Sequence, residues 1–451
     1  MRVGKSLAWV CLSAAGAAAV FASQPAGAVP LFARQTGMAC ASCHAGGNYL
    51  ELTSVGRQFK LLGYTLGTRQ AIPLSGMLMV GNTRLRNQNG SADPATDLAH
   101  DRATQLQQFS LFSGGRITDH LGAMVQWTYD GVEHHSALDN TDLRYARQVG
   151  VGGKDLLYGI TLNNNPSVQD VFNSTPAWGY PYIGPGGAFQ GYGAQPVVMG
   201  AYAQQLAGLG VYADWNNTLY AEFSGYKTAN GALSFLRAGT YNPDSYANGS
   251  SPYVLKGVSP YWRLAWHGDS GSHSWEIGTF GMNADQYSDG FDGGSPLIRY
   301  RDLALDAQYQ YASGLHVWSA QGLYVHEKQK YDSALVGPGL GYDNGSNSLR
   351  WAQLKGSYTY RQKYGASMAL FSSSGSRDAQ LYADNTNPVP DTRGYILEFD
   401  YLPMDRVKLG FQYTGYSKFN GASSNYDASG TFTGRNASDN NTFYLFGWAA
   451  F

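Results

Sequence analysis

The feature that most constrains the fold of this chain is a series of segments in which apolar and polar residues alternate. Between residues 303 and 311 the odd positions are apolar or aromatic, whereas the even positions include Asp306, Gln308 and Gln310. The ranges 395–401 and 407–413 repeat the pattern. Because successive side chains of a strand point to opposite faces, each segment predicts a strand with one apolar and one polar face. A soluble β-sandwich shows the same alternation, so the periodicity alone does not decide between a sandwich and a barrel.

The lengths of the connections between the expected strands distinguish a barrel from a sandwich better than the periodicity does. Short connections such as 118–119, 216–217, 313–314 and 403–404 alternate with long ones at 165–195, 228–257, 328–347 and 418–440. Bacterial outer-membrane barrels have this asymmetry, together with an even number of strands. We therefore predict an all-β fold, a transmembrane outer-membrane β-barrel of about 16 antiparallel strands, over residues 74–451. The expected strands are 76–86, 104–117, 120–130, 139–149, 154–164, 196–215, 218–227, 258–267, 273–284, 300–312, 315–327, 348–361, 364–374, 393–402, 405–417 and 441–451.

The N-terminus has the features of a secretory signal peptide. Arg2 and Lys5 precede an apolar run from Leu7 to Phe21, and the small residues 26–28 suit a signal-peptidase site. We expect residues 1–28 to be removed, which leaves 29 basic against 32 acidic residues and a formal charge of −3. A chain without a basic excess is not expected to bind nucleic acid.

Residues 40–44 form a motif that indicates cofactor attachment. Cys40-Ala41-Ser42-Cys43-His44 matches C-x-x-C-H, in which two thiols add to the vinyl groups of one haem and the imidazole binds its iron. The motif predicts one covalently attached haem c, with His44 as the proximal ligand. A zinc site would need a second cysteine pair, and the chain's third cysteine lies in the expected signal peptide.

A small helical c-type haem segment is expected over residues 29–73. Its second half predicts an amphipathic helix that Thr53 or Ser54 caps, with Val55, Phe59 and Leu62 on one face, Arg57 and Lys60 facing away, and Gly63 after its end. Roughly 45 residues are too few to bury a haem unaided, so we expect the barrel to complete the haem's surroundings.

The sequence leaves several candidates for the second axial ligand of the iron. Met77 and Met79 stand at the start of the first expected strand and Met38 just before the motif, and a methionine ligand would raise the haem potential. These methionines would otherwise pack or face lipid. A barrel histidine or an open coordination position are the alternatives.

Two further segments each allow a functional and a purely structural interpretation. The acidic and histidine residues in 130–135, Asp130, Glu133, His134 and His135, would suit a divalent metal near the barrel entrance, or are solvated loop residues. The long connection 165–195 is long enough to fold inward and narrow the pore, or forms an external lid.

The glycine pairs at 114–115 and 152–153 predict bends or turns. No hydrolase motif or phosphate-binding loop is present in the sequence.

Several stretches resemble the fused monohaem cytochrome-porins, an outer-membrane family that includes bacterial Fe(II)-oxidising cytochromes c. The resemblance covers residues 30–44 with the haem motif, Leu52-Thr53, the block 56–64, Asn163-Asn164-Asn165-Pro166, Gln169-Asp170 and 175–179. It implies a haem segment inserted from the periplasmic side into a porin-like barrel. It also implies that electrons pass from extracellular Fe(II) to a periplasmic c-type cytochrome, an activity of the ferrous-iron:cytochrome oxidoreductase type. The alternatives are a conduit for another donor or acceptor, and a diffusion porin whose haem-bearing segment is a plug or sensor.

Overall fold

The computed structural model describes residues 30–47, 50–87, 104–132, 134–186, 189–237, 253–428 and 434–451. They form one closed antiparallel barrel of sixteen strands in which every strand pairs with its neighbours in the sequence. Strand β1 closes the barrel by pairing with β16, from Met77 opposite Ala450 to Leu85 opposite Thr442. The predicted fold is therefore confirmed. The expected signal peptide lies outside the described residues.

The strand bounds agree with the expected ones to within a few residues at every strand but the sixth. That strand was expected from residue 196, but it begins at Leu206, because residues 196–205 belong to the loop inside the barrel and include the short helix η4 (Val197–Met199). The strands are β1 (Leu74–Leu85), β2 (Thr104–Arg116), β3 (Leu121–Asp130), β4 (His135–Val151), β5 (Lys154–Asn163), β6 (Leu206–Trp215), β7 (Leu219–Thr228), β8 (Ser259–Ser270), β9 (His273–Tyr287), β10 (Leu297–Ser313), β11 (His316–Tyr331), β12 (Ser346–Tyr360), β13 (Tyr364–Gly375), β14 (Thr392–Met404), β15 (Val407–Lys418) and β16 (Thr442–Ala450).

The two faces of the sheet differ as the alternation predicts. On β10, Leu303 and Leu305 are 54% and 60% exposed on the outside, whereas Asp306 and Gln308 are buried inside. An apolar outer face around a polar interior is the arrangement of barrels that span lipid. Within the described ranges, no helix has the length and apolar character needed to cross a membrane.

Aromatic side chains gather near the end of the barrel that bears the short connections, here called the short-turn end. Ring centres lie 4.4 Å apart in the pair Trp266–Trp275 and 4.2 Å apart in the pair Trp318–Tyr358. Aromatic residues are enriched where barrel walls meet lipid headgroups. The opposite end, with the long loops, is called the long-loop end.

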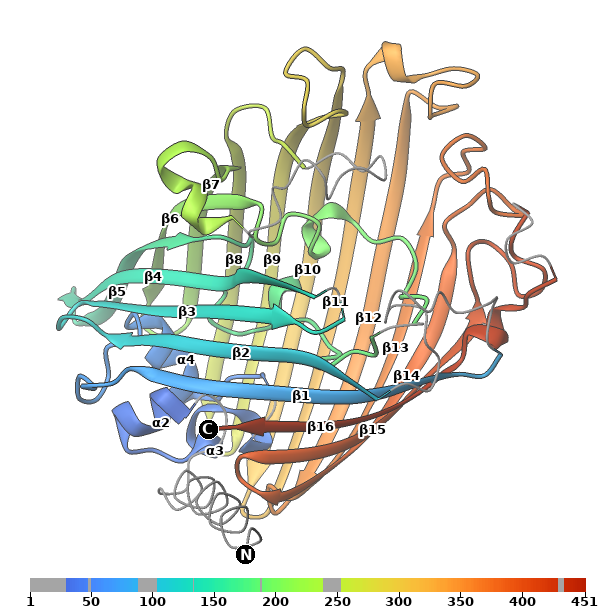
Figure 1. Ribbon diagram of the computed structural model, residues 1–451. Helices are drawn as coiled ribbons and strands as arrows, with labels where there is room; N and C mark the ends of the chain where they lie inside the picture. Colours follow the sequence, from blue (N-terminus) through green and yellow to red (C-terminus); the bar gives the residue numbers. More distant parts are fainter. Residues whose placement is uncertain are drawn as a thin grey trace, which may run out of the picture.

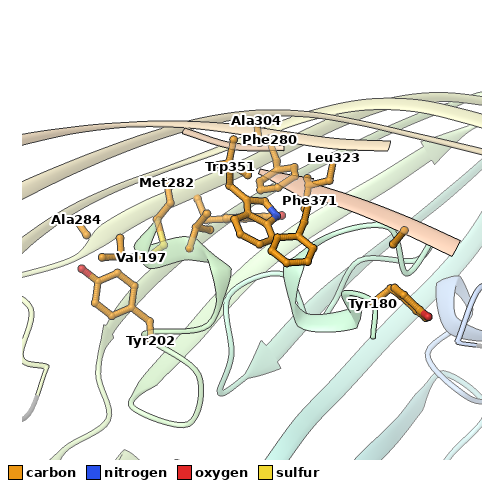
Figure 2. Close-up of a cluster of buried hydrophobic side chains, with 14 of the residues drawn as sticks. Tyr180, Val197, Tyr202, Phe280, Met282, Ala284, Ala304, Leu323, Trp351 and Phe371 are labelled. Atoms are coloured by element: carbon orange, nitrogen blue, oxygen red, sulfur yellow. The ribbon is translucent and has the colours of Figure 1, made fainter. Parts of the chain in front are cut away.

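The connection from β5 to β6, residues 164–205, folds into the barrel, which is the inward alternative of the two considered. We call it the inner loop. It includes the short helix η3 (Pro176–Trp178), and its residues pack against inward side chains of distant strands, including Trp351 and Phe371 (Figure 2). Hydrogen bonds of its backbone fix it to two strands far around the barrel from β5: Val197 N–H donates to Glu327 on β11 (2.6 Å), and Gln412 on β15 donates to the Ile183 carbonyl (3.1 Å). The inner loop therefore crosses the lumen.

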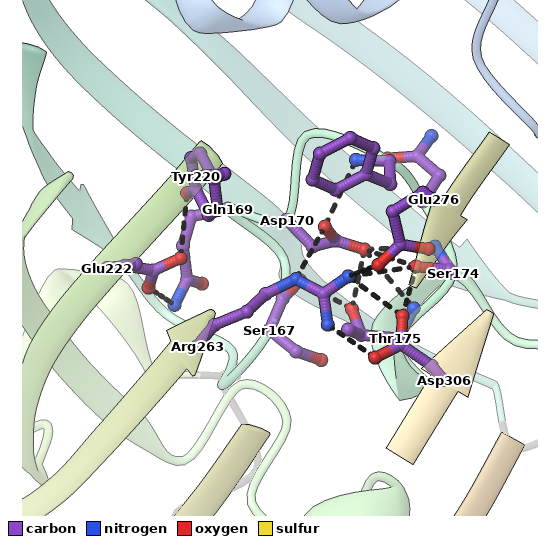
Figure 3. A network of polar contacts seen from close by, with 12 residues as sticks. Ser167, Gln169, Asp170, Ser174, Thr175, Tyr220, Glu222, Arg263, Glu276 and Asp306 are labelled. Carbon is purple, nitrogen blue, oxygen red and sulfur yellow. Dashed lines mark hydrogen bonds and ion pairs between the residues drawn. The ribbon is translucent and has the colours of Figure 1, made fainter. Parts of the chain in front are cut away.

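A buried polar network holds the first part of the inner loop. Arg263 on β8 lies 3.2 Å from Asp170 of the loop and 2.8 Å from both Glu276 on β9 and Asp306 on β10 (Figure 3). Asp170 also accepts hydrogen bonds from the backbone N–H groups of residues 172 (3.0 Å), 174 (2.9 Å) and 175 (3.2 Å). The arginine and its three carboxylates thus tie the loop to three neighbouring strands.

The N-terminal segment consists of α2 (Pro30–Thr36), α3 (Cys40–Cys43), the 3₁₀ turn η1 (Ala45–Gly47) and α4 (Ser54–Leu61). These helices lie at the end of the barrel where the C-terminus of the chain is found (Figure 1). This is the short-turn end, since a Cβ at Gly46 would overlap the Thr359 hydroxyl, next to the turn after β12. The other short helices, η5 (Gly231–Leu236), η7 (Ser333–Leu335) and η8 (Ala437–Asn440), lie in long connections.

Helix α4 has the predicted ends but not the predicted faces. Thr53 caps it by accepting a hydrogen bond from Gly56 N–H, and Gly63 follows it with φ +68°. Val55 is 39% exposed, however, and Arg57 and Lys60 are buried. The expected stripe was wrong at these positions because the helix packs into a barrel interior whose walls are polar and supply partners for charged side chains.

Both glycine pairs sit where the chain bends. Gly114 and Gly115 of β2 have φ of +149° and +94°, and a Cβ at Gly115 would overlap the Gln35 side-chain oxygen. Gly152 and Gly153 form the turn between β4 and β5. The first pair lets the N-terminal segment approach the barrel wall closely.

Candidate functional site

The C-x-x-C-H residues form a compact turn. Cys40 to Cys43 make the single helical turn α3, and His44 N–H closes it with a 2.8 Å hydrogen bond to the Cys40 carbonyl. Both cysteines are in the thiol form and partly buried, and burial raises the pKa of the Cys43 thiol. Cys40, Cys43 and His44 all line one cavity.

Helix α4 supports this turn from behind. The Thr53 hydroxyl donates to the Ser42 carbonyl (2.6 Å), and Thr53 N–H donates to the Cys43 carbonyl (2.9 Å). A Cβ at Gly56 would overlap the Cys43 carbonyl oxygen, so only glycine allows this close packing. The Leu52-Thr53 and Gly56 positions of the resemblance therefore have a local role, which is to place the motif.

The cavity has a volume of about 360 Å³ and lies between the N-terminal segment, the first strands, the inner loop and the last two strands. Most of its lining is apolar, including Phe32, Ala33, Leu50, Leu52, Phe59, Phe112, Ile183 and Trp448. Its polar lining includes Gln108, Gln126, Asn140, Asn173 and Lys408. An apolar cavity with a few polar groups is the usual form of a cofactor site.

All three methionines considered as iron ligands line this cavity with the motif. Met77 and Met79 lie two residues apart on the inner face of β1 and pack in a cluster with Ile183, Tyr444 and Phe446. Met79 is buried, whereas Met38 is 41% exposed beside the motif. Met124 of β3 also lines the cavity and was missed, since a single methionine in a strand carries no signal of its position.

Lys60 joins the site to the inner loop. Its ammonium donates to the carbonyls of Val168 (2.8 Å) and Asp170 (2.5 Å) and to the Asn173 side chain (2.9 Å), and it lies 4.1 Å from the Trp178 ring centre. Burial lowers the pKa of Lys60 to about 7, helped by the charge of Arg144 and opposed by nearby carboxylates. Both Lys60 and Trp178 line the cavity, so the inner loop forms part of its wall.

A second buried charge connects the N-terminal segment to the opposite wall. Glu51 forms an ion pair with Lys355 of β12 and accepts a hydrogen bond from Ser319 of β11 (3.0 Å). Burial alone would raise the pKa of Glu51, but the Lys355 charge and hydrogen bond outweigh burial and hold that pKa below its usual range. Lys355 also donates to the hydroxyl of Tyr182, which lines the cavity (2.8 Å).

The donor set fits a haem c. Two cysteine thiols and an imidazole line an apolar cavity, and thioether sulfurs are available from its β1 wall. Cys40 and Cys43 would hold the ring, His44 would bind the iron, and Met77 or Met79 would supply the second axial ligand. The charged partners Lys60 and Glu51 were not predicted as site residues, because their partners come from sequence positions more than 100 residues away.

The 130–135 stretch is described only in part, because Glu133 is outside the described residues. His134 lies near Tyr129, with 3.3 Å between its Nδ1 and the tyrosine hydroxyl, and Asp130 accepts a hydrogen bond from Val132 N–H (2.7 Å). In the part of the chain that the structure describes, no three histidine, cysteine or acidic side chains lie together as a metal site.

Comparisons with known proteins were made by family, by sequence and by fold. No protein-family model matches the chain, and no curated protein matches its sequence. Among solved structures, the chain is similar to the outer membrane channel DcaP of Acinetobacter baumannii, with 14% identity, 84% of this chain and 96% of that chain covered, and a TM-score of 0.47. It is also similar to Salmonella typhi OmpF in complex with daunomycin, with 14% identity, 84% and 97% covered and a TM-score of 0.46. An anion-selective porin from Comamonas acidovorans gives 14% identity, 84% and 98% covered and a TM-score of 0.45.

The closed sheet of sixteen antiparallel strands, with its apolar outside and alternating turns, defines the chain as a β-barrel of the outer-membrane type. Its distinguishing feature is a cavity that contains a C-x-x-C-H turn inside the barrel.

Proposed function

We propose that this protein is a bacterial outer-membrane electron-transfer protein that holds one covalently attached haem c. In this proposal it oxidises an extracellular donor, Fe(II), and passes electrons to a periplasmic c-type cytochrome. The observation that carries the proposal is the shared cavity: Cys40, Cys43 and His44 line it together with Met77 and Met79 of β1.

The chain's own residues would perform three tasks. Cys40 and Cys43 tether and orient the cofactor, and His44 binds its iron. The apolar lining, with Phe59 and Phe112 among its members, lowers the polarity around the cofactor. Met77 or Met79 sets the potential, because a thioether ligand stabilises the reduced iron. A haem c supplies a reversible one-electron couple when bound.

The expected potential of the haem supports Fe(II) as the donor. Fe(II) is a weak reductant, so its oxidation needs an acceptor of fairly high potential. The cluster of buried apolar side chains around Met79 and the thioethers themselves both favour such a potential, since burial and methionine ligation raise it.

The barrel geometry supports a periplasmic acceptor. Outer-membrane barrels have short turns on the periplasmic side and long loops outside. The motif lies at the short-turn end, so in this orientation the haem segment is inserted from the periplasmic side and faces a periplasmic acceptor.

Two alternatives remain as competing proposals. A conduit for another donor or acceptor would use the same site at a different potential. A diffusion porin with a haem-bearing plug would need an open path, yet the inner loop crosses the lumen and is fixed to β11 and β15 by backbone hydrogen bonds. A lumen narrowed by this loop supports transfer of electrons over diffusion of solutes.

Anaerobic mixing of the purified, oxidised holoprotein with Fe(II) tests the proposal. Haem absorption followed at the organism's growth pH should report fast reduction, and a correctly inserted His44→Ala variant should lose it. Haem that dithionite reduces but Fe(II) does not would refute the iron-oxidising function. Solute conductance without any redox turnover would favour the porin instead.

A further inference from the structure

The haem motif is exposed to solvent on one side. Residues 37–39, directly before Cys40, are exposed at the short-turn end, and Met38 is 41% exposed although it also lines the cavity. Cys40 itself is only partly buried. A cofactor tethered here would thus be reached from the short-turn end through a small apolar opening.

Two basic residues stand on one side of this opening. The turn between β12 and β13 contains Arg361 and Lys363, both exposed. A Cβ at Gly47 would lie 3.6 Å from the Gln362 side chain and 3.7 Å from Ala41, so the turn lies next to the helix that carries both cysteines. Arg361 and Lys363 therefore flank the motif directly.

Two further basic residues lie on α2 and in the turn between β14 and β15. Arg34 of α2 is largely exposed; partial burial and, to a smaller extent, the nearby charge of Arg406 in the turn between β14 and β15 lower the pKa of Arg34. Arg34 is six residues before Cys40, and its guanidinium donates to the Leu74 carbonyl. Asp405 is the exposed acidic residue of the same turn as Arg406.

We propose that this surface, an apolar centre at Met38 and Ala39 with Arg34, Arg361, Lys363 and Arg406 around it, docks an acidic electron-carrier protein. The inference rests on the proposed function, and it adds the class of partner and the residues that meet it. Basic side chains around the exit of the cofactor attract and orient a partner that has carboxylates around its own cofactor edge. In the docked complex one electron passes to the oxidised carrier, and no bond forms or breaks.

The basic residues have one competing role. Arg361 lies over the Tyr360 ring (5.2 Å to the ring centre) and Lys363 over the Tyr401 ring (5.7 Å), and basic residues beside interfacial aromatics also bind anionic lipid. The position of these two residues beside the cysteine helix favours the protein partner, and a measurement of lipid binding separates the two roles.

The test measures equilibrium binding of two soluble probes of opposite charge to the holoprotein in detergent. The acidic probe is the soluble domain of cytochrome b5, and the basic one is mitochondrial cytochrome c. The wild type should bind the acidic probe more tightly, with weaker binding at high salt. The double variant Arg361→Glu/Lys363→Glu should bind it about tenfold more weakly and should bind the basic probe more tightly.

The matched control reverses two exposed lysines of β11 near the long-loop end, in the variant Lys328→Glu/Lys330→Glu, and should leave both affinities unchanged. Equal loss in the control, or no preference of the wild type for the acidic probe, would overturn the docking surface. Loss of bound phosphatidylglycerol from the first variant with unchanged cytochrome b5 binding would assign these residues to lipid. Binding is measured independently of haem staining, so absence of haem refutes the proposed function and not the surface.

Discussion

Glu51 of the N-terminal segment and Lys355 of strand β12 form a buried ion pair, although 304 residues separate them in the chain. Their side chains are 0% and 2% exposed. Because Lys355 also donates to Tyr182 of the inner loop, one contact joins the segment, the barrel wall and the loop. A buried pair of this kind leaves an uncompensated charge when one partner is removed.

Replacement of Lys355 by methionine should therefore loosen the N-terminal segment. We expect a loss of about 3–5 kcal/mol in the docking of that segment, which hydrogen exchange over residues 50–66 would measure. The double variant Glu51→Gln/Lys355→Met should recover part of the loss, since it leaves no buried charge. The exposed Lys330 on the neighbouring strand provides the control, and a Lys355→Met effect no larger than that of Lys330→Met would contradict the prediction.

Covalent attachment of haem should depend on both cysteines of the motif. Cys40→Ala and Cys43→Ala should each weaken the haem-stained band on a denaturing gel, and the double variant should abolish it, because each thiol forms one thioether. Ser42→Ala, between them, should retain full staining. Persistence of the band in the double variant would show that the haem is bound elsewhere.

If a methionine binds the iron, its replacement should lower the midpoint potential of the haem. The double variant Met77→Leu/Met79→Leu should lower the midpoint potential by a readily measured part of the roughly 0.8 V range that axial ligands span. It should also lose the spectral band of methionine-bound ferric haem, and the single variants identify the ligand. Met282→Leu, in the core away from the cavity, should change neither. An unchanged potential in the double variant would leave a histidine or an open position as the alternatives.

Glycine at position 56 should be required for the site. Alanine normally stabilises a helix relative to glycine by roughly 0.5–1 kcal/mol, but at Gly56 its Cβ would overlap the Cys43 carbonyl. We expect Gly56→Ala to reduce haem attachment and to unfold the segment more easily. Gly150→Ala, where a Cβ meets nothing within 4 Å, should behave as wild type. Normal haem content in Gly56→Ala would mean that the turn tolerates displacement.

The inner loop should limit conductance. Replacement of residues 180–199 by a short Gly-Ser linker should raise single-channel conductance in planar bilayers severalfold, since the loop crosses the lumen. Replacement of the connection between β11 and β12, residues 332–345 at the long-loop end, by the same linker should not. A wild type that already conducts as well as the shortened protein would support the diffusion porin.

Much of the fold could be predicted from local pattern. The alternation at 303–311 repeats every two residues, and a strand pairs with its sequence neighbours in this barrel, so strand order followed from chain order. The one misplaced strand start, at residue 196 instead of Leu206, arose where apolar residues such as Val197 and Val198 pack in the lumen and not in the wall.

The sequence by itself determined the barrel and the alternation of its turns, and it predicts a haem at Cys40, Cys43 and His44, because these depend on periodicity and on residue types at short spacing. Only the tertiary structure decided that Met77 and Met79 line the same cavity as the motif, that the inner loop lies inside, and that Arg57 and Lys60 are buried. The reason is physical. Partners such as Lys355 for Glu51 and the Val168 carbonyl for Lys60 come from distant positions, and only closure of the sheet brings them together.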